Sequence, residues 1–124
     1  MTTRPRKRAA RLTRLVATAL TLATRKSGWK PLRDGVDLLR LAGDDKAGPS
    51  AALLRYAPGA RVPAHRHPGF EVIYVLAGAQ SDTRGTYPAG TLVVNRAGGS
   101  HHVWSDDGCL VLIVWERPIE FVRE

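Results

Sequence analysis

The sequence predicts an all-β protein, a sandwich or barrel, preceded by a basic N-terminal tail that is helical or disordered. From Trp29 onward, short apolar runs recur at a spacing of roughly ten residues, and glycine, proline and aspartate separate them. No helical period lies between these runs. The 124 residues suit one ordinary domain. We therefore expect a tail over residues 1–28 and one β domain over residues 29–124.

Each predicted strand is an apolar run bounded by turn-forming residues. The turn segments include GDDKAGPS, Pro58-Gly59 and SDTRGTYPAG, which contain the residues that turns favour. The run EVIYVL is the clearest strand, since it is rich in β-branched and aromatic residues. In chain order, the predicted strands are residues 36–42, 51–56, 71–76, 91–94, 102–104 and 110–115.

The positive charge of the chain belongs to the tail. The first 30 residues hold nine basic residues and no acidic one, whereas the remainder holds ten basic and eleven acidic residues. A nearly neutral domain lacks the basic face that nucleic-acid binding requires. We therefore expect no specific nucleic-acid partner, and a tail that is suited to contact anionic surfaces.

The tail has two interpretations. Apolar residues from Leu12 to Ala23 recur at helical spacing and predict a basic amphipathic helix. The basic start followed by LVATALTLA also resembles an export signal, although threonines interrupt its apolar run. No stretch approaches the length of a transmembrane helix. The single cysteine, Cys109, cannot form a disulfide within the chain. We expect a cytoplasmic protein, with export as the alternative.

The four histidines lie in two short segments. His65 and His67 are one residue apart, so in a strand both project to the same side. Glu71 follows a proline–glycine bend, and His101 and His102 follow the turn RAGGS after one strand–turn–strand hairpin. If the hairpin folds back, the two segments become neighbours.

Three imidazoles and one carboxylate suit one divalent first-row metal, and the donor set accepts zinc, iron, manganese or nickel. An isolated His-x-His pair is more often a surface feature than a metal site. Without a metal, the inward-facing cluster would need water or a hydrogen-bond network, since each unpaired buried polar group costs about 1–3 kcal/mol.

The glycines around these histidines form two spaced motifs. The motif G-x5-H-x-H-x3-E-x6-G is matched in full by Gly59, His65, His67, Glu71 and Gly78. The motif G-x5-P-x-G-x2-H-x3-N is matched at Gly90, Gly98 and His101, with Arg96 in place of proline and Ser105 in place of asparagine. These two motifs are those of the cupin superfamily, which the chain resembles.

The segments LLRYAPGARVPAHRHPGFEVIYVLAG, SDTRGTYPAGT and SDDGC resemble the ChrR-like branch of the cupins, over residues 29–118. The resemblance implies a small jelly-roll-type β-barrel with one divalent metal on His65, His67, Glu71 and His101. Because the branch often reads G-S-x-H, His102 is the alternative to His101, which the spacing from Gly90 favours. Cupins commonly pair through sheet edges, so a homodimer is expected.

The resemblance implies two kinds of function. The namesake arrangement joins such a cupin to an N-terminal zinc-binding domain that restrains an alternative sigma factor. The first 30 residues contain no histidine or cysteine for that zinc, so we expect a metal-binding module responsive to a small molecule or oxidant, without the sigma-binding domain.

The alternative is an enzyme, so the sequence leaves open whether the chain is one. Similar cupins include non-haem iron dioxygenases that act on small carbonyl compounds. In a dioxygenase, Glu71 would be a fourth ligand or a catalytic base. In an isomerase or lyase, which is a third possibility, Glu71 would be the proton carrier.

Other polar and aromatic residues have ordinary interpretations. Cys109 is expected in the core, and Tyr74 or Trp115 would line the pocket if its strand face is inward. Arg61 and Arg96 are expected at a solvated rim, with an anionic ligand as the alternative.

Overall fold

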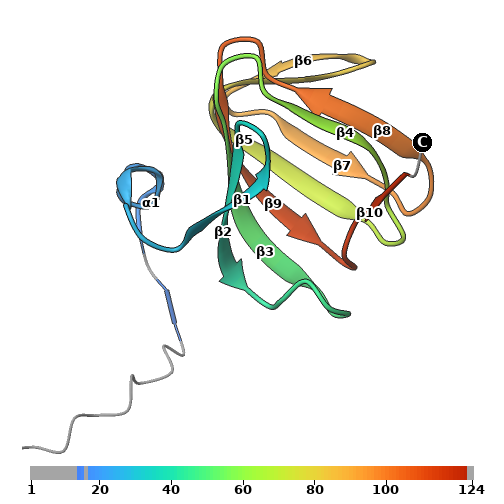
Figure 1. The fold of residues 1–124 in the computed structure, drawn as a ribbon, viewed down its shortest axis with the longest axis horizontal. Helices are drawn as coiled ribbons and strands as arrows, with labels where there is room; N and C mark the ends of the chain where they lie inside the picture. Colours follow the sequence, from blue (N-terminus) through green and yellow to red (C-terminus); the bar gives the residue numbers. More distant parts are fainter. Residues whose placement is uncertain (1–13, 16, 123–124) are drawn as a thin grey trace, which may run out of the picture.

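The computed structural model describes residues 14–15 and 17–122. One short helix precedes ten strands, and Figure 1 shows the strands curled around a common interior. The elements are α1 (Ala19–Thr24), β1 (Trp29–Arg33), β2 (Val36–Ala42), β3 (Ser50–Tyr56), β4 (Arg61–Arg66), β5 (Glu71–Asp82), β6 (Gly85–Pro88), β7 (Leu92–Asn95), β8 (Ser100–Trp104), β9 (Cys109–Trp115) and β10 (Glu120–Phe121).

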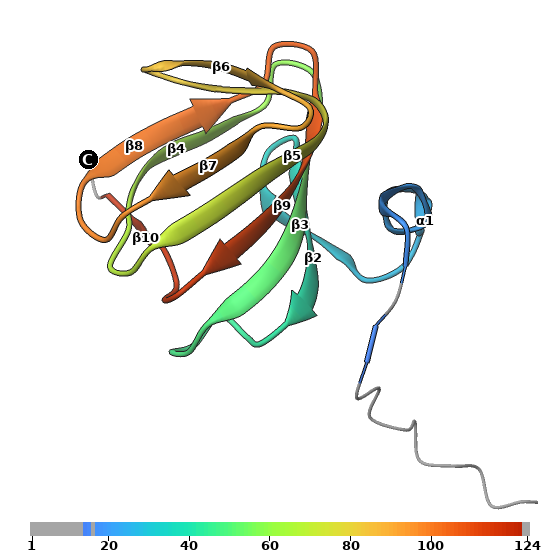
Figure 2. The ribbon, with the colours of Figure 1, turned by 180° about the vertical axis from the view of Figure 1, so that it is seen from behind.

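The strands pair in the order β1-β2-β3-β9-β5-β8-β4-β10, with β6 and β7 also paired to β5. Every one of these pairings is antiparallel. Figure 2 shows from behind how β4 and β8 face β3 and β9 across the barrel. The predicted all-β class and the jelly-roll-type barrel are confirmed.

The long strand β5 connects the two layers. Its first residues, Glu71 to Tyr74, lie between β7 and β9, whereas Ser81 and Asp82 pair with β8. A register shift between Val75 and Ala77 and a left-handed Gly78 (φ 69°) mark the change of layer. Such irregularities bend a strand and allow it to turn a corner of a barrel.

The hydrophobic core fills the interior of the barrel. Its buried side chains alternate along the strands, as expected when one strand face is covered; they are Val36, Leu38, Ala52, Leu54, Tyr56, Ala60, Val62, Ile73, Val75, Val103, Cys109, Val111, Ile113 and Trp115. A smaller cluster of Leu39, Leu53 and Leu110 lies on the outside of the same sheet. Leu22 and Ala23 of α1 pack against that cluster, so the helix lies outside the barrel (Figures 1 and 2).

The strand bounds differ from the sequence-based ones where polar residues or proline enter a strand. β2 begins and ends as predicted, but the segment expected to be one turn, SDTRGTYPAG, contains the end of β5 and all of β6. The strands β1, β6 and β10 were not predicted, and β4 was expected only as the strand of His65 and His67, of which it contains His65. β1 and β4 each contain a proline and charged residues, and a register shift accompanies the proline in both. Tertiary pairing overrides local propensity in these strands.

Among the described strands, β7 pairs with β5 alone, so it has one free edge. Leu92 and Val94 on β7 are exposed, as is Tyr74 opposite Leu92. An exposed edge of this kind is usually protected, and the homodimer stays a prediction. No helix in the described part of the chain is long and apolar enough to cross a membrane.

Candidate metal centre

Strand register brings the candidate residues together. His65 on β4 pairs directly with His101 on β8. Glu71 on β5 lies between Asn95 of β7 and Trp115 of β9. Residues directly opposite on neighbouring strands share a face of the sheet. These five side chains therefore project from the two layers into one interior space.

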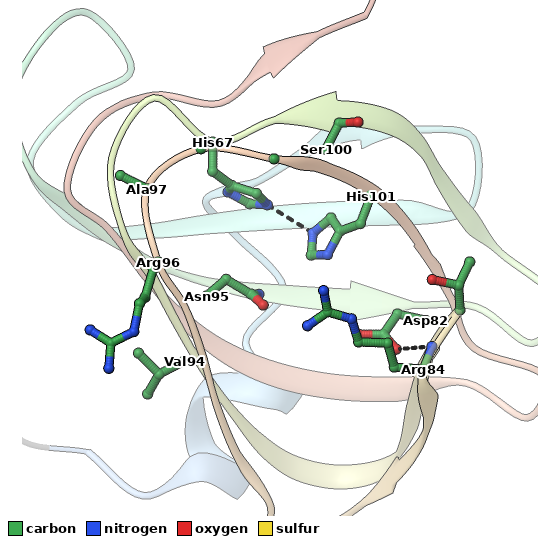
Figure 3. Close-up of a pocket in the computed structure, with 12 residues that line it drawn as sticks. His67, Asp82, Arg84, Val94, Asn95, Arg96, Ala97, Ser100 and His101 are labelled. Atoms are coloured by element: carbon green, nitrogen blue, oxygen red, sulfur yellow. Dashed lines mark hydrogen bonds between the residues drawn. The ribbon is translucent and has the colours of Figure 1, made fainter.

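His67 comes from the segment that follows β4. Its backbone N–H donates to the Gly99 carbonyl (3.3 Å), and its carbonyl accepts from the N–H of Gly98 (2.8 Å). Both glycines have positive φ values (93° for Gly98 and 74° for Gly99), which a side chain would disfavour. These two hydrogen bonds hold the turn before β8 against His67. The rings of His67 and His101 approach each other nearly at right angles, with ring centres 4.6 Å apart (Figure 3).

The four candidate ligands form one compact group. One donor atom from each of His65, His67, Glu71 and His101 lies within 4.8 Å of the other three. The Nε2 atoms of His67 and His101 are 2.8 Å apart. The carboxylate oxygens of Glu71 lie 3.5 Å from His67 Nδ1 and 3.8 Å from His101 Nε2. The structure thus brings all four together.

Glu71 is a buried carboxyl group with two hydrogen-bond donors. It is 1% exposed. Trp115 Nε1 donates to Oε2 (2.7 Å), and Asn95 Nδ2 donates to Oε1 (3.0 Å). Burial raises the pKa of Glu71 to about 7, although both hydrogen bonds act to lower it. Because these donors stabilise the charged form, a nearby cation would readily ionise the group.

The histidines are kept neutral. Burial lowers the pKa of His67 and of His101 to about 4, and it also lowers the pKa of His65. His65 Nδ1 lies 2.9 Å from the Pro63 carbonyl oxygen. A carbonyl oxygen only accepts, so Nδ1 carries the proton and Nε2 keeps its lone pair. Metal binding needs neutral imidazoles oriented in this way, and the donor set fits a divalent cation.

The group opens to solvent on one side. A pocket of about 430 Å³ is bounded by His67 and His101, by the turn between β5 and β6, and by the loop from β7 to β8. Within the barrel, the space beside His65, Glu71 and His101 is only about 10 Å³. A small molecule could therefore approach the group through the open pocket, whereas the barrel interior is closed by packing.

Several residues lie outside the group of four. The His102 ring stacks on Trp104, with ring centres 5.3 Å apart and an angle of 24°. Cys109 is buried in the core, and burial raises its pKa to about 11. Tyr74 is 40% exposed, and Arg61 lines a separate surface hollow.

Sequence reasoning missed two residues of the site and its pocket, Asn95 and Arg84. Asn95 ends the apolar run TLVV with an amide, a residue that strands disfavour, and that signal could have identified it. Arg84 lies in a segment interpreted as a turn alone. Arg96 lines the pocket, at the rim where it was expected.

Residues 17–119 match the family model described as a ChrR cupin-like domain. The chain belongs to this family. The match covers most of the chain, and it includes both cupin motifs and all four candidate ligands. No match is found among curated proteins.

Solved structures of other cupins share the fold of this ChrR-like chain. The structure of SigE in complex with the anti-sigma ChrR from Rhodobacter sphaeroides contains a chain that is 28% identical to this one. The alignment covers 69% of this chain and 46% of that chain, with a TM-score of 0.61. A cupin-like protein of unknown function from Ralstonia eutropha is 22% identical, with coverages of 66% and 55% and a TM-score of 0.61. The chain thus spans about half the length of these two neighbours.

An acetylacetone dioxygenase from Acinetobacter johnsonii is 15% identical and aligns with 100% of this chain and 86% of its own, with a TM-score of 0.75. At this identity, the likeness shows a shared fold.

Proposed function

We propose that this ChrR-like cupin binds one divalent metal through His65, His67, Glu71 and His101, and that it acts as a module responsive to a small molecule or an oxidant. The observation that carries the proposal is the convergence of four donor atoms within 4.8 Å beside an open pocket. When bound, the metal would supply Lewis acidity and positions for oxygen donors.

Three of the four candidate ligands would be positioned by other residues. The Pro63 carbonyl orients His65, the Gly98 and Gly99 backbone holds His67, and Asn95 with Trp115 holds Glu71. Partners of this kind orient metal ligands, and their loss typically lowers metal affinity about 10–100-fold. This arrangement supports a rigid group of ligands with His67 and His101 beside the open pocket.

The responsive role is supported by the family and by the exposure of the centre. The anti-sigma ChrR of Rhodobacter sphaeroides, whose structure was solved in complex with SigE, is 28% identical to this chain. His101 is only partly buried and borders the pocket, so a small molecule or peroxide can reach the ligands. We infer that such a molecule changes the metal centre, and that the change alters the stability of the barrel.

The second candidate is a metal-dependent dioxygenase that acts on a small carbonyl compound. The specific support is the alignment of the whole chain with the acetylacetone dioxygenase from Acinetobacter johnsonii. Glu71 lies against His67 and His101, where it would serve as a fourth ligand or as a base. Oxygen consumption with acetylacetone by the iron-loaded protein would favour the enzyme. Metal loss or a change in stability under peroxide, without turnover, would favour the responsive module.

The first experiment is elemental analysis of the untagged protein, together with His67→Ala and His102→Ala. We expect about one metal ion per chain in the wild type, its loss in His67→Ala, and its retention in His102→Ala, since His102 stacks on Trp104 outside the group. Wild-type protein that stays metal-free after reconstitution with zinc, iron, manganese and nickel would contradict the proposal. Equal metal content in all three proteins would contradict the ligand assignment.

A further inference from the structure

The turn between β5 and β6 carries an arginine into the pocket beside the candidate metal centre. Arg84 lines the same pocket as His67 and His101. In Figure 3 its guanidinium is directed toward the space beside His101 and Asn95, whereas Arg96 extends away from the histidines.

The turn that holds Arg84 is tied by Asp82. Its Oδ1 accepts hydrogen bonds from the backbone N–H of Arg84 (2.8 Å), from the N–H of Gly85 (3.2 Å) and from the hydroxyl of Tyr87 (2.8 Å). An aspartate that binds the backbone two residues ahead stabilises a tight turn. The hydroxyl of Tyr87 adds a contact from β6, so the base of Arg84 is held beside the pocket.

The guanidinium of Arg84 is available for a ligand. The ion pairs of the described residues involve Arg55, His67 and His101, so Arg84 is within 4 Å of no carboxylate in that part of the chain. Asp82 is the one acidic residue among those that line the pocket. Arg84, Arg96 and a bound divalent ion would together carry more positive charge than Asp82 and Glu71 carry negative charge. This excess of positive charge in the pocket favours an anion.

We propose that this pocket selects a small carboxylate that bears a second oxygen, such as a 2-oxo acid, with Arg84 binding the carboxylate. The proposal rests on the metal binding proposed above, because the ligand's other oxygen would lie toward the histidines. A guanidinium presents paired donors that match a carboxylate. The pocket of about 430 Å³ suits a small metabolite. Arg84 is thus a specificity-determining residue.

The test compares pyruvate with methyl pyruvate, a neutral ester of similar shape, by calorimetric titration of the zinc-loaded protein. We expect pyruvate to bind the wild type at least about tenfold more tightly than the ester, a difference of about 1.4 kcal/mol. Arg84→Gln should lose this preference and leave ester binding unchanged. Arg117→Gln removes the same charge outside the pocket and should keep the preference.

Elemental analysis of each sample separates this proposal from the metal assignment. Arg84→Gln should retain the metal, because Arg84 is not among the four candidate ligands. Zinc-loaded wild type that binds both compounds equally, or binds neither, would overturn the carboxylate proposal and leave the metal assignment standing. An equal loss of pyruvate affinity in Arg84→Gln and Arg117→Gln would also overturn it. Failure of the wild type to bind any metal would overturn both.

Discussion

Replacing Trp115 with phenylalanine tests how the site depends on the residues around the ligands. Trp115 is buried and donates from Nε1 to Glu71 Oε2 at 2.7 Å. Phenylalanine keeps an aromatic ring in the core but has no donor. Glu71, which is 1% exposed, would then keep the donor of Asn95 and lose its shorter hydrogen bond.

The expected loss has two parts. A hydrogen bond to a charged group contributes about 1.5–3 kcal/mol, and the smaller ring leaves a cavity that costs roughly 1 kcal/mol more. The free energy of unfolding should therefore fall by about 2.5–4 kcal/mol, which corresponds to roughly 10–16 °C in the melting temperature at about 4 °C per kcal/mol. The loss should be larger at pH 8 than at pH 6, because the pKa of Glu71 is about 7. Metal affinity should fall about 10–100-fold, as for other residues that orient ligands.

Two assays measure these effects. Thermal unfolding of the metal-free protein, followed by circular dichroism, gives the stability, and competition with a chromogenic chelator gives the zinc affinity. Trp104→Phe is the matched control, since Trp104 is partly exposed and stacks on His102. Unchanged zinc affinity in Trp115→Phe, or an equal loss in Trp104→Phe, would refute the reasoning.

Two further predictions concern the stability of the protein: its dependence on pH, and its loss when glycines with positive φ are replaced. Between pH 6.5 and 4.5 the metal-free protein should lose about 1.4 kcal/mol of stability per pH unit. Unfolding returns the pKa of His67 and His101 from about 4 to 6.5, so both take up protons, whereas Glu71 releases one as its pKa falls from about 7 to 4.5. Urea unfolding at several pH values measures this slope, and stability that is constant or rises on acidification would contradict it. Gly59→Ala should cost about 1–2 kcal/mol for its positive φ of 79°. Gly78→Ala should cost more, because its Cβ would also overlap the Gly108 backbone, whereas a Cβ at Gly59 meets open space; equal urea midpoints for the two variants would refute this account.

The apolar runs and the glycine spacing predict much of the fold. β2 has its predicted bounds, β3 and β9 each begin one residue earlier than predicted, and β7 begins and ends one residue later. In these strands, burial of one face makes apolar and polar residues alternate, and burial of both faces gives a continuous apolar run. Both patterns can be recognised in the sequence. Proline and charged residues break that period in β1 and β4, so the sequence hides β1 and indicates β4 only through its histidines; pairing with other strands forms both.

The candidate ligands were predictable, but their surroundings were not. His65, His67, Glu71 and His101 stand at fixed spacings, and the structure brings them within 4.8 Å. Asn95 and Trp115 act on Glu71 through the register of three strands. A register is a relation between segments far apart in the chain, and a shift of one residue would turn both side chains away from Glu71.

The sequence by itself determined the class of the protein, because burial of one strand face imposes a short-range period, and the cupin motifs concentrate the donors in two segments. The sequence favoured His101 over His102 by its spacing from Gly90, and the tertiary structure brings His101 into the group and stacks His102 on Trp104, since adjacent strand residues face opposite sides. Only the tertiary structure decided how Asn95 and Trp115 meet Glu71, because strand register sets that contact. The tertiary structure also decided that Arg84 lies in the pocket. The residues of a turn show no periodic pattern in the sequence, so the direction of the Arg84 side chain depends on how the β5–β6 hairpin folds.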